Sequence, residues 1–305
     1  MDRSRPGKES SRAPWNDSAS ASELLRIRDL TIDFGDGPAV NGVNLDLRPG
    51  KIVGVAGQSG SGKSLTALAA MGLAPAGARV RGSIRFRGTE LVGRSEREMS
   101  KIRGSGMTMV FQETVTALNP VVHVGRQLSL AVKANVACDA EERHARVVRS
   151  LHDVQLDDAD RIMSSYPHEL SGGMCQRVMI AMALVCGADV LLADEPTTAL
   201  DVTVQREVID IIRKVADERA IAVMLISHDI GVLEEVCDEL AVMFNGRVVE
   251  HGAAQDVVTS PAHPYTAALL NSVPRIGART ETFVEMPEFA YAVGDHRAAS
   301  EVTTS

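Results

Sequence analysis

Residues 57–64 are Gly57-Gln58-Ser59-Gly60-Ser61-Gly62-Lys63-Ser64, a full match to the pattern G-x-x-x-x-G-K-[ST]. An apolar run at 52–56 precedes them and predicts a buried strand, and the run at 65–71 predicts a helix that stops at Gly72. We therefore predict a loop that wraps the phosphates of a nucleoside triphosphate with backbone N–H groups. Lys63 adds a positive charge, and Ser64 offers a hydroxyl to Mg²⁺. The alternative is a chance Gly/Ser-rich turn, which the flanking strand and helix disfavour.

Length and composition bound the class of protein. A chain of 305 residues can hold one large domain or two small ones with a substantial core. Apolar residues make up 45% and charged residues 24%, as in soluble globular proteins. The formal net charge of -8 at pH 7 and the 3% aromatic content favour neither a basic field nor a base-stacking surface. No nucleic-acid partner is expected.

Cysteine spacing and hydropathy indicate in which cellular compartment the protein is expected. The four cysteines form no C-x-x-C pair and are expected to be reduced thiols of a cytosolic protein. No segment reaches the ~18–20 uncharged apolar residues that cross a bilayer. Residues 1–22 are rich in serine and charge and are predicted to be a disordered tail, neither signal peptide nor anchor. Any membrane role would therefore act through a partner.

The remaining pattern predicts an α/β fold. Alternation at 24–46 and 80–91 predicts two antiparallel hairpins. A polar helical stretch, about 114–172, separates two halves of α/β alternation. The later strands are predicted at 107–111, 190–193, 221–226 and 240–244, the last in a hairpin around Asn245-Gly246. The predicted fold is thus a P-loop NTPase (RecA-like) core with an antiparallel β subdomain and a helical subdomain insertion.

Polar residues follow several of these strands directly. Gln112, Asp194-Glu195 and His228 each come after an apolar run, as the phosphate loop does. Ligands of open parallel sheets bind outside the carboxyl ends of the strands, so these residues are predicted to share one site. Asp194 can hold Mg²⁺, and Glu195 can orient the attacking water, in the pattern of a Walker B motif. Solvated loop carboxylates are the alternative interpretation.

A second glycine-rich segment lies at Leu170-Ser171-Gly172-Gly173-Met174. It precedes a predicted helix at 175–185, so it forms another helix N-terminus suited to an anion. A chain that binds one nucleotide with one loop has no evident need of a second cradle. The segment is therefore predicted to close on the nucleotide of a second subunit. The alternative is a flexible Ser-Gly hinge.

These motifs, in this order, resemble the ATP-binding-cassette (ABC) ATPases. Leu-Ser-Gly-Gly at 170–173, with Gln176-Arg177 behind it, resembles their signature motif. The resemblance extends from about residue 24 to residue 274. The other family elements match in chain order: Phe34 for the aromatic stacked on adenine, Gln112 for the Q-loop, Ala199-Leu200-Asp201 for the D-loop and His228 for the switch histidine.

The resemblance implies a role for each matching residue. Two cassettes would sandwich ATP and Mg²⁺ head to tail, with residues 171–173 (Ser171, Gly172, Gly173) at the γ-phosphate of the opposite subunit. Glu195, His228 and Gln112 would be catalytic; Ser64, Asp194 and Gln112 would serve the metal; Phe34 and Asp201 would contact nucleotide. Simpler alternatives stand beside these roles: Phe34 as a core residue, Asp201 as a helix cap and His228 as a structural histidine.

Two further segments resemble the oligopeptide/dipeptide/nickel importers. They are Leu118-Asn119-Pro120 with Val124-Gly125-Arg126-Gln127, and residues 260–270, which contain His263-Pro264-Tyr265. The resemblance implies an ATPase at the cytoplasmic face of the inner membrane. Its partners would be an identical or paralogous cassette, two transmembrane permease subunits and, indirectly, a solute-binding protein. The 260–270 segment is interpreted as a surface turn and one amphipathic helix without chemistry.

The sequence also departs from this subfamily. Glu113-Thr114 follows Gln112 where Asp-Pro is usual, and residues 275–305 hold none of the cysteines that ligate an iron–sulfur cluster in some members. We expect no cluster. The predicted domains are a tail at 1–22, the ATPase domain at 23–252 and a C-terminal extension at 253–305. The alternatives are a soluble cassette in DNA repair, chromosome structure or translation, and a regulatory module without turnover.

Overall fold

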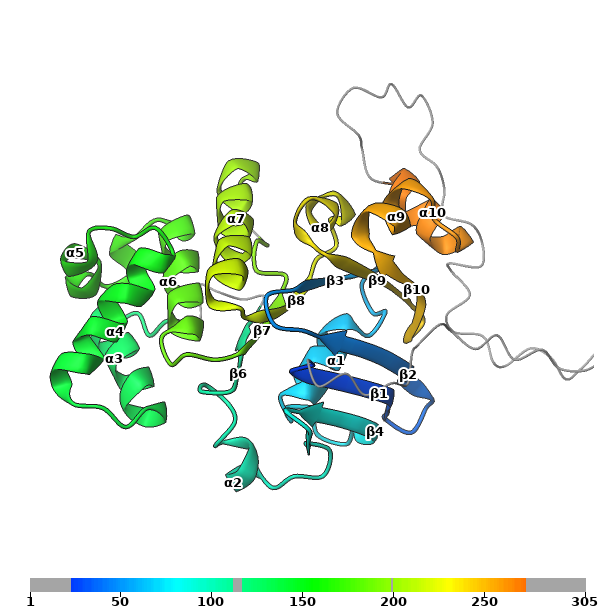
Figure 1. Cartoon of the computed structure of the whole chain (residues 1–305), viewed down its shortest axis with the longest axis horizontal. Helices are drawn as coiled ribbons and strands as arrows, with labels where there is room; N and C mark the ends of the chain where they lie inside the picture. The colour runs from blue at the N-terminus through cyan, green and yellow to red at the C-terminus, as the bar shows by residue number, and fades with distance from the viewer. Residues whose placement is uncertain (1–22, 112–116, 199, 273–305) are drawn as a thin grey trace, which may run out of the picture.

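The computed structural model describes residues 23–111, 117–198 and 200–272. Within them, a six-stranded sheet has the order β10-β9-β3-β8-β7-β6, and β10 alone in that sheet is paired antiparallel (Figure 1). Its strands are β3 (Ile52–Ala56), β6 (Met107–Val110), β7 (Val190–Asp194), β8 (Ala222–Ile226), β9 (Glu239–Phe244) and β10 (Arg247–Ala253). The strands predicted from short apolar runs are confirmed: β3 has the predicted ends, and the ends of β6, β7, β8 and β9 differ by one residue at most.

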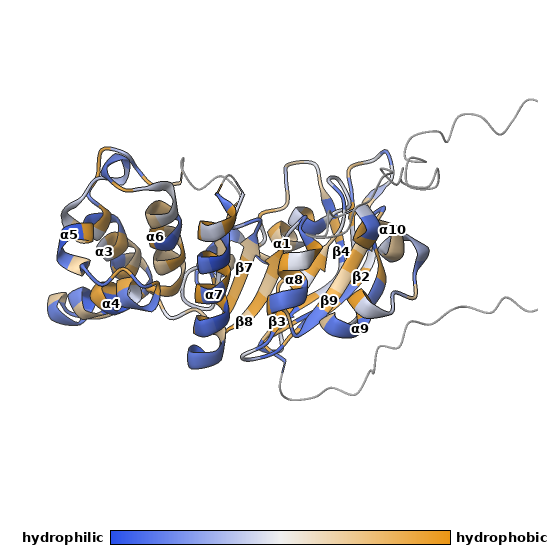
Figure 2. Cartoon of the chain, turned by 90° about the horizontal axis from the view of Figure 1, so that it is seen from above, coloured by the Kyte–Doolittle hydropathy of each residue, from blue (hydrophilic) through white to orange (hydrophobic). Residues whose placement is uncertain are grey.

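The central strands are apolar throughout because both faces of the sheet are covered. Ile52 and Ala56 of β3 face one core cluster, whereas Val53 and Val55 face the other. Such strands appear as continuous hydrophobic runs and not as alternating ones. Figure 2 shows the apolar strands beneath α7 (Val202–Arg219), whose outer side is polar. The continuous pattern at 190–193 has the same cause.

The second sheet, in the order β2-β1-β4-β5, is antiparallel. It consists of β1 (Leu25–Asp33), β2 (Pro38–Leu47), β4 (Arg79–Phe86) and β5 (Thr89–Glu90) and confirms both predicted hairpins. Its inner side shares one core cluster with β3 and with helix α1 (Lys63–Ala70). This sheet therefore covers the face of the six-stranded sheet from which the phosphate loop enters α1.

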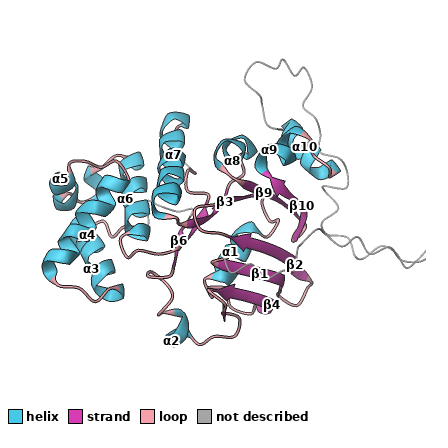
Figure 3. Ribbon diagram, in the orientation of Figure 1, coloured by secondary structure: helices cyan, strands magenta, loops and turns pink. Residues whose placement is uncertain are grey.

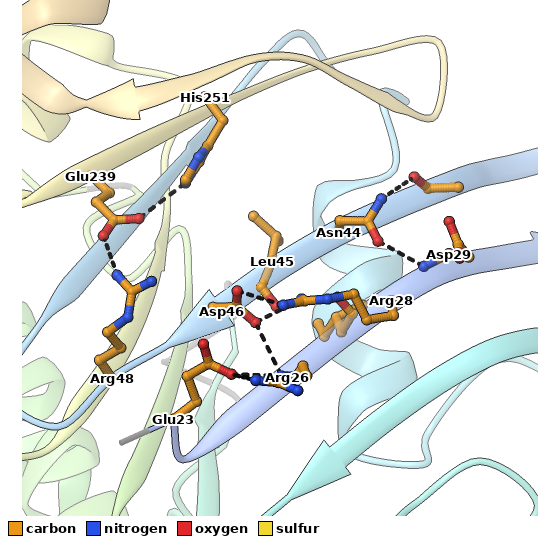
Figure 4. A network of polar contacts seen from close by, with 12 residues as sticks. Glu23, Arg26, Arg28, Asp29, Asn44, Leu45, Asp46, Arg48, Glu239 and His251 are labelled. Atoms are coloured by element: carbon orange, nitrogen blue, oxygen red, sulfur yellow. Dashed lines mark hydrogen bonds and ion pairs between the residues drawn. The ribbon is translucent and has the colours of Figure 1, made fainter. Parts of the chain in front are cut away.

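A network of polar side chains fastens the two sheets together at the end opposite the phosphate loop (Figure 4). Arg28 of β1 donates to both carboxylate oxygens of Asp46 in β2, at 2.6 and 2.7 Å. Just beyond β2, Arg48 donates to Oε1 of Glu239 at 2.7 Å, and Nε2 of His251 lies 3.2 Å from the other oxygen. Donation from His251, aided by Arg48, keeps the pKa of Glu239 below its usual range. The network fixes the start of β9 relative to β2.

A group of helices occupies one end of the molecule, away from the antiparallel sheet (Figure 3). Helix α6 (Gly172–Leu184) packs there against α3 (Val124–Asn135) and α4 (Ala140–Asp153) through the larger core cluster. The remaining helices are α2 (Glu96–Met99), α5 (Ala159–Ser164), the 3₁₀ turn η1 (Pro167–Glu169), α8 (Ile230–Val236), α9 (Ala254–Thr259) and α10 (Pro264–Ser272). None of the helices in the described ranges is long and apolar enough to span a bilayer. The domain boundaries at 114, 172 and 252 remain predictions.

Two helices begin earlier than their apolar patterns predict. Helix α1 starts at Lys63 and not at Leu65, and α6 starts at Gly172 and not at Cys175. In both cases the helix begins with two residues, Lys63-Ser64 or Gly172-Gly173, that add nothing to an apolar stripe. The glycine-rich motifs therefore supply the start of each helix, where the first N–H groups have no partner within the helix.

Candidate nucleotide-binding site

The phosphate loop connects β3 to α1, and its glycines are required by sterics. Gly57 has φ 148°, and a Cβ there would lie 2.3 Å from the carbonyl oxygen of Met243 in β9. Gly62, the N-cap of α1, has φ 101°, and its Cβ would lie 3.0 Å from the carbonyl oxygen of Ala39. Left-handed backbone with no room for a side chain is available only to glycine. Contacts with one strand from each sheet, β9 and β2, thus restrict the loop to one backbone conformation.

Lys63 is buried beneath this loop and bound to it. Its Nζ donates to the carbonyl oxygens of Gly57 at 2.7 Å and Gln58 at 2.8 Å. Burial lowers the pKa of Lys63, while the nearby Glu195 and Asp194 carboxylates oppose that shift. The ammonium group is therefore held inside the loop, where the phosphates of a nucleotide would lie.

Ser64 and Asp194 meet across the gap between α1 and β7. The Ser64 hydroxyl donates to Oδ1 of Asp194 at 2.9 Å. Burial raises the pKa of Asp194, and the hydrogen bond from Ser64 only partly offsets this effect. A hydroxyl and a carboxylate that converge at the end of a buried strand are the oxygen donors that Mg²⁺ prefers. The residues present therefore fit a magnesium ion.

Glu195 follows β7 in a strained conformation. Its φ is 47°, which is uncommon outside glycine, and its N–H donates to the Ile226 carbonyl of β8 at 3.0 Å. Oε2 accepts from the hydroxyl of Thr198 at 3.0 Å and lies 3.5 Å from Nδ1 of His228. Strain of this kind persists where the surroundings dictate the geometry, often at functional sites. The side chain is thus aimed at the carboxyl end of the sheet, beside His228.

The segment 171–173 starts α6 and packs beside the start of α7. Ser171 is the N-cap of the 13-residue helix α6 and accepts from Met174 N–H at 3.3 Å. Asp201 caps α7 by accepting from Val204 N–H at 3.0 Å, which confirms the predicted capping role. A Cβ on Gly173 would lie 2.6 Å from Cγ1 of Val204, so these helix starts touch closely. Across the described residues, no hydrogen bond or ion pair joins this segment to residues 57–64.

The remaining predicted residues have different outcomes. Phe34, just beyond β1, is 46% exposed, so the interpretation of Phe34 as a core residue is wrong. Gln112 and Ala199 lie outside the described residues. The structure brings five of the predicted residues together through the Ser64–Asp194 hydrogen bond, the Glu195–His228 contact and the charge of Lys63 beside both carboxylates: Lys63, Ser64, Asp194, Glu195 and His228. The nucleotide-contacting and catalytic roles of all these residues remain predictions.

Sequence reasoning missed one neighbour of the loop. The hydroxyl of Tyr265 in α10 accepts a hydrogen bond from the backbone N–H of Gln58 at 3.1 Å. The signal in the sequence is His263-Pro264-Tyr265, but this pattern by itself predicts a turn and a surface helix, not a contact with the loop. Periodicity cannot reveal such a contact, because 207 residues separate the two partners.

Comparison with known proteins gives two family matches. Residues 40–198 match the ABC transporter family, and residues 249–296 match the oligopeptide/dipeptide transporter C-terminal region. The oligopeptide transport ATP-binding protein OppD of Escherichia coli K12 is 45% identical over 271 residues, covering 88% of this chain and 80% of OppD. The glutathione import ATP-binding protein GsiA of Salmonella typhimurium is 42% identical over 276 residues, covering 87% of this chain and 44% of GsiA.

A solved structure supports the same assignment. The dimeric ATP-binding cassette MJ0796, in a post-hydrolysis state bound to ADP and Pi, superposes with a TM-score of 0.66 and 27% sequence identity. The match covers 76% of this chain and 99% of that cassette chain. The chain belongs to the ATP-binding-cassette transporter family. Within this family it carries the C-terminal region of the oligopeptide/dipeptide transporters and is an ATP-hydrolysing subunit.

These findings confirm the predicted fold class, the family resemblance and the enzyme class. They do not favour a soluble cassette that acts in DNA repair, chromosome structure or translation, nor a regulatory module without turnover. The iron–sulfur prediction concerns residues 275–305, which lie outside the described residues, and stays a prediction.

Proposed function

We propose that this chain hydrolyses ATP to energise peptide uptake. It would work at the cytoplasmic face of the inner membrane, beside a second cassette and two transmembrane permease subunits. A solute-binding protein outside the membrane would deliver the peptide to the permeases and so meet this chain only indirectly. Similarity to OppD, an oligopeptide transport protein, and to GsiA, a glutathione import protein, supports a peptide solute over nickel or a metal chelate.

The observation that carries the proposal is the contact between Ser64 and Asp194, with Lys63 alongside. Three groups of different chemistry converge there: a hydroxyl, a carboxylate and an ammonium. A triphosphate needs positive charge at its β- and γ-oxygens and oxygen ligands for its metal. Ser64, Asp194 and, by family resemblance, Gln112 would hold Mg²⁺, which would neutralise charge on the phosphate oxygens.

ATP binding would draw Lys63 from one set of oxygens to another. Its Nζ now donates to the carbonyls of Gly57 and Gln58, and phosphate oxygens would replace these neutral acceptors with charged ones. Charge-assisted hydrogen bonds are about twice as strong as neutral ones. The backbone N–H groups of the loop and the start of α1 would hold the same phosphates, and Phe34 would stack on adenine.

Hydrolysis would use the groups that follow β7 and β8. Glu195 would orient the attacking water and accept its proton. His228, whose side chain is 69% exposed, would donate to the γ-phosphate as negative charge develops there. The partner cassette would contribute its own copy of residues 171–173 and Asp201. In return, this chain's Ser171 and the two glycines would serve the partner's nucleotide.

Purification of the assembly from membranes tests the proposal. We expect two permease proteins and a cassette to copurify with the chain, and the complex to drive ATP-dependent peptide uptake into vesicles. A Lys63→Ala variant is the matched control, since it should assemble with the permeases and fail to drive uptake. Copurification of nucleic acid without membrane proteins would overturn the proposal. Uptake that accepts nickel chelates and rejects peptides would overturn the peptide assignment alone.

A further inference from the structure

The side chain of Tyr265, in the C-terminal extension, reaches the phosphate loop. It is fully buried, and its hydroxyl accepts from Gln58 N–H at 3.1 Å. Its ring packs on Phe244 at the end of β9, with centroids 4.3 Å apart. Met243, the preceding residue of β9, is the one whose carbonyl leaves Gly57 no room for a side chain. Tyr265 and β9 thus support the beginning of the loop together.

The residues around Tyr265 fix where its hydroxyl lies. The Glu250 carboxylate of β10 accepts from the N–H groups of Ala262 at 2.7 Å and His263 at 3.0 Å. Nδ1 of His263 then accepts from Tyr265 N–H at 3.1 Å and so caps the start of α10. Pro264 is the first residue of α10, where its missing N–H costs nothing. Each residue of the His-Pro-Tyr sequence therefore helps to place the tyrosine.

The hydrogen bond to Tyr265 is donated by the same peptide unit that binds Lys63. This peptide joins Gly57 to Gln58: its carbonyl oxygen accepts from Lys63 Nζ at 2.7 Å, and its N–H donates to Tyr265. The peptide is planar, so holding one side fixes the direction of the other. Without the hydroxyl, the Gly57–Gln58 peptide could rotate and shift the oxygen that locates Lys63.

We propose that Tyr265 is a positioning residue for nucleotide binding. Its hydroxyl orients the Gly57–Gln58 peptide, and through it the loop and Lys63, so that the C-terminal extension supports the ATP site directly. This inference rests on the proposed role of residues 57–64 as the phosphate site. Preorganisation of this kind strengthens binding because less ordering is left to occur when the ligand arrives.

A purely packing role for Tyr265 does not account for its hydroxyl. A buried phenol normally needs a hydrogen-bond partner, and this one lies on the loop. The next residue, Thr266, shows that a partner is not automatic in this helix. Its buried hydroxyl has no hydrogen-bond partner within the part of the chain that the structure describes. Thr266→Val is therefore a matched control that removes a hydroxyl one residue away from Tyr265 without touching the loop.

The experiment compares ATP hydrolysis by the full transporter with wild-type chain, Tyr265→Phe and Thr266→Val. For Tyr265→Phe we expect the KM for ATP to rise about fivefold, the equivalent of one ordinary hydrogen bond of ~1 kcal/mol, with kcat within twofold of wild type. Thr266→Val should leave both constants unchanged. An unchanged KM for Tyr265→Phe, or an equal rise in both variants, would overturn the inference.

A second variant tests the other end of the same hydrogen bond. Gln58→Pro removes the donor N–H and leaves α10 intact, so it should raise KM as Tyr265→Phe does, and the double variant should show no further rise. Additive effects would overturn the inference. If Tyr265→Phe folds poorly, Gln58→Pro alone still tests it, because an unchanged KM in that variant would also overturn the inference. Lys63→Ala separates the two failures. If it binds ATP as wild type does, the proposed phosphate site is wrong; if it loses ATP while Tyr265→Phe does not, only the role of Tyr265 is wrong.

Discussion

Nδ1 of His228 lies 3.5 Å from Oε2 of Glu195, at the ends of the paired parallel strands β8 and β7. The same carboxylate oxygen accepts from the Thr198 hydroxyl at 3.0 Å. Two different segments therefore fix the position of one oxygen, while the backbone N–H of Glu195 donates to the carbonyl oxygen of Ile226. Because so many contacts hold the residue, its charge can be changed with little change in its position.

The first prediction concerns that charge. Glu195→Gln keeps the size of the side chain and an oxygen for Thr198, but it removes the base that would accept a proton from water. We expect ATP binding close to wild type and hydrolysis reduced by ~10²–10⁴-fold, the usual contribution of a general base. Nucleotide binding and single-turnover phosphate release measure the two effects separately. Turnover near the wild-type rate would remove Glu195 from the catalytic role.

The second prediction concerns the stability of the nucleotide-free protein. Burial raises the pKa of Asp194, and this net direction already includes the attraction of Lys63. A carboxyl with a raised pKa in the folded state binds its proton more tightly there. Stability is therefore lost as pH rises from 3.8 through the folded-state pKa. Asp194→Asn removes this cost, so we expect the variant to be more stable than wild type at pH 7.

Urea unfolding across a pH series checks this expectation. The advantage of Asp194→Asn should shrink as pH falls through the folded-state pKa toward 3.8, and it should disappear well below 3.8, where the wild-type carboxyl is protonated in both states. The same variant should lose most of the stabilisation that Mg²⁺ and ATP give the wild type, since a neutral amide is a poor metal ligand. Lower stability than wild type at pH 7 would contradict the prediction.

Much of the fold is accessible from the sequence because its signals are local. Three kinds of element depend only on neighbouring residues: the glycine loop, the apolar runs of β3, β7 and β8, and the hairpin at 245–246. The sequence predicts all of them. Residues placed after strands, such as Asp194 and His228, could be assigned to one end of the sheet by the rule for parallel strands. Sheet order, by contrast, depends on which strands pair, and no local pattern encodes that β9 lies beside β3.

The parts of the site that escaped prediction are contacts between distant segments. Tyr265 reaches Gln58 through the path of α10, and Lys63 binds carbonyl oxygens of its own loop. Neither of these two contacts can be predicted from composition or periodicity. The strained φ of Glu195 likewise accompanies a hydrogen bond from its N–H to the Ile226 carbonyl in the neighbouring strand. Tertiary structure also determines that Phe34 projects outward, although an aromatic residue after a strand is equally consistent with a core position.

The third prediction uses the exposure of Phe34. If its ring stacks on adenine, Phe34→Ala should weaken ATP binding by ~1–3 kcal/mol, the usual cost of losing a base–aromatic stack. Binding of tripolyphosphate, which lacks a base, should not change. Leu73→Ala, at another exposed apolar residue, is the control for general surface effects. Equal weakening of both ligands would show that Phe34 supports the loop and not the base.

The fourth prediction separates two adjacent glycines of α6. A Cβ on Gly173 would lie 2.6 Å from Cγ1 of Val204, whereas one on Gly172 would find its nearest neighbour, a Leu200 methyl, at 3.9 Å. Valine is stiff about χ1, so α7 must shift to admit the Gly173 methyl. We expect Gly173→Ala to lower the free energy of unfolding by ~1–3 kcal/mol, as overpacking does. Gly172→Ala should have wild-type stability.

The rate of ATP hydrolysis by the Gly172→Ala variant tests the proposed role of Gly172 at the partner's nucleotide. Gly172 is exposed at the start of α6, where the proposed dimer would bring it close to the γ-phosphate held by the other subunit. A methyl group there should reduce ATP hydrolysis by the assembled transporter while leaving urea unfolding and ATP binding by the isolated chain unchanged. Because the fold tolerates the methyl, lost turnover would point to a contact that forms only in the assembled transporter. Full activity of Gly172→Ala would argue that residues 171–173 do not approach a partner's nucleotide.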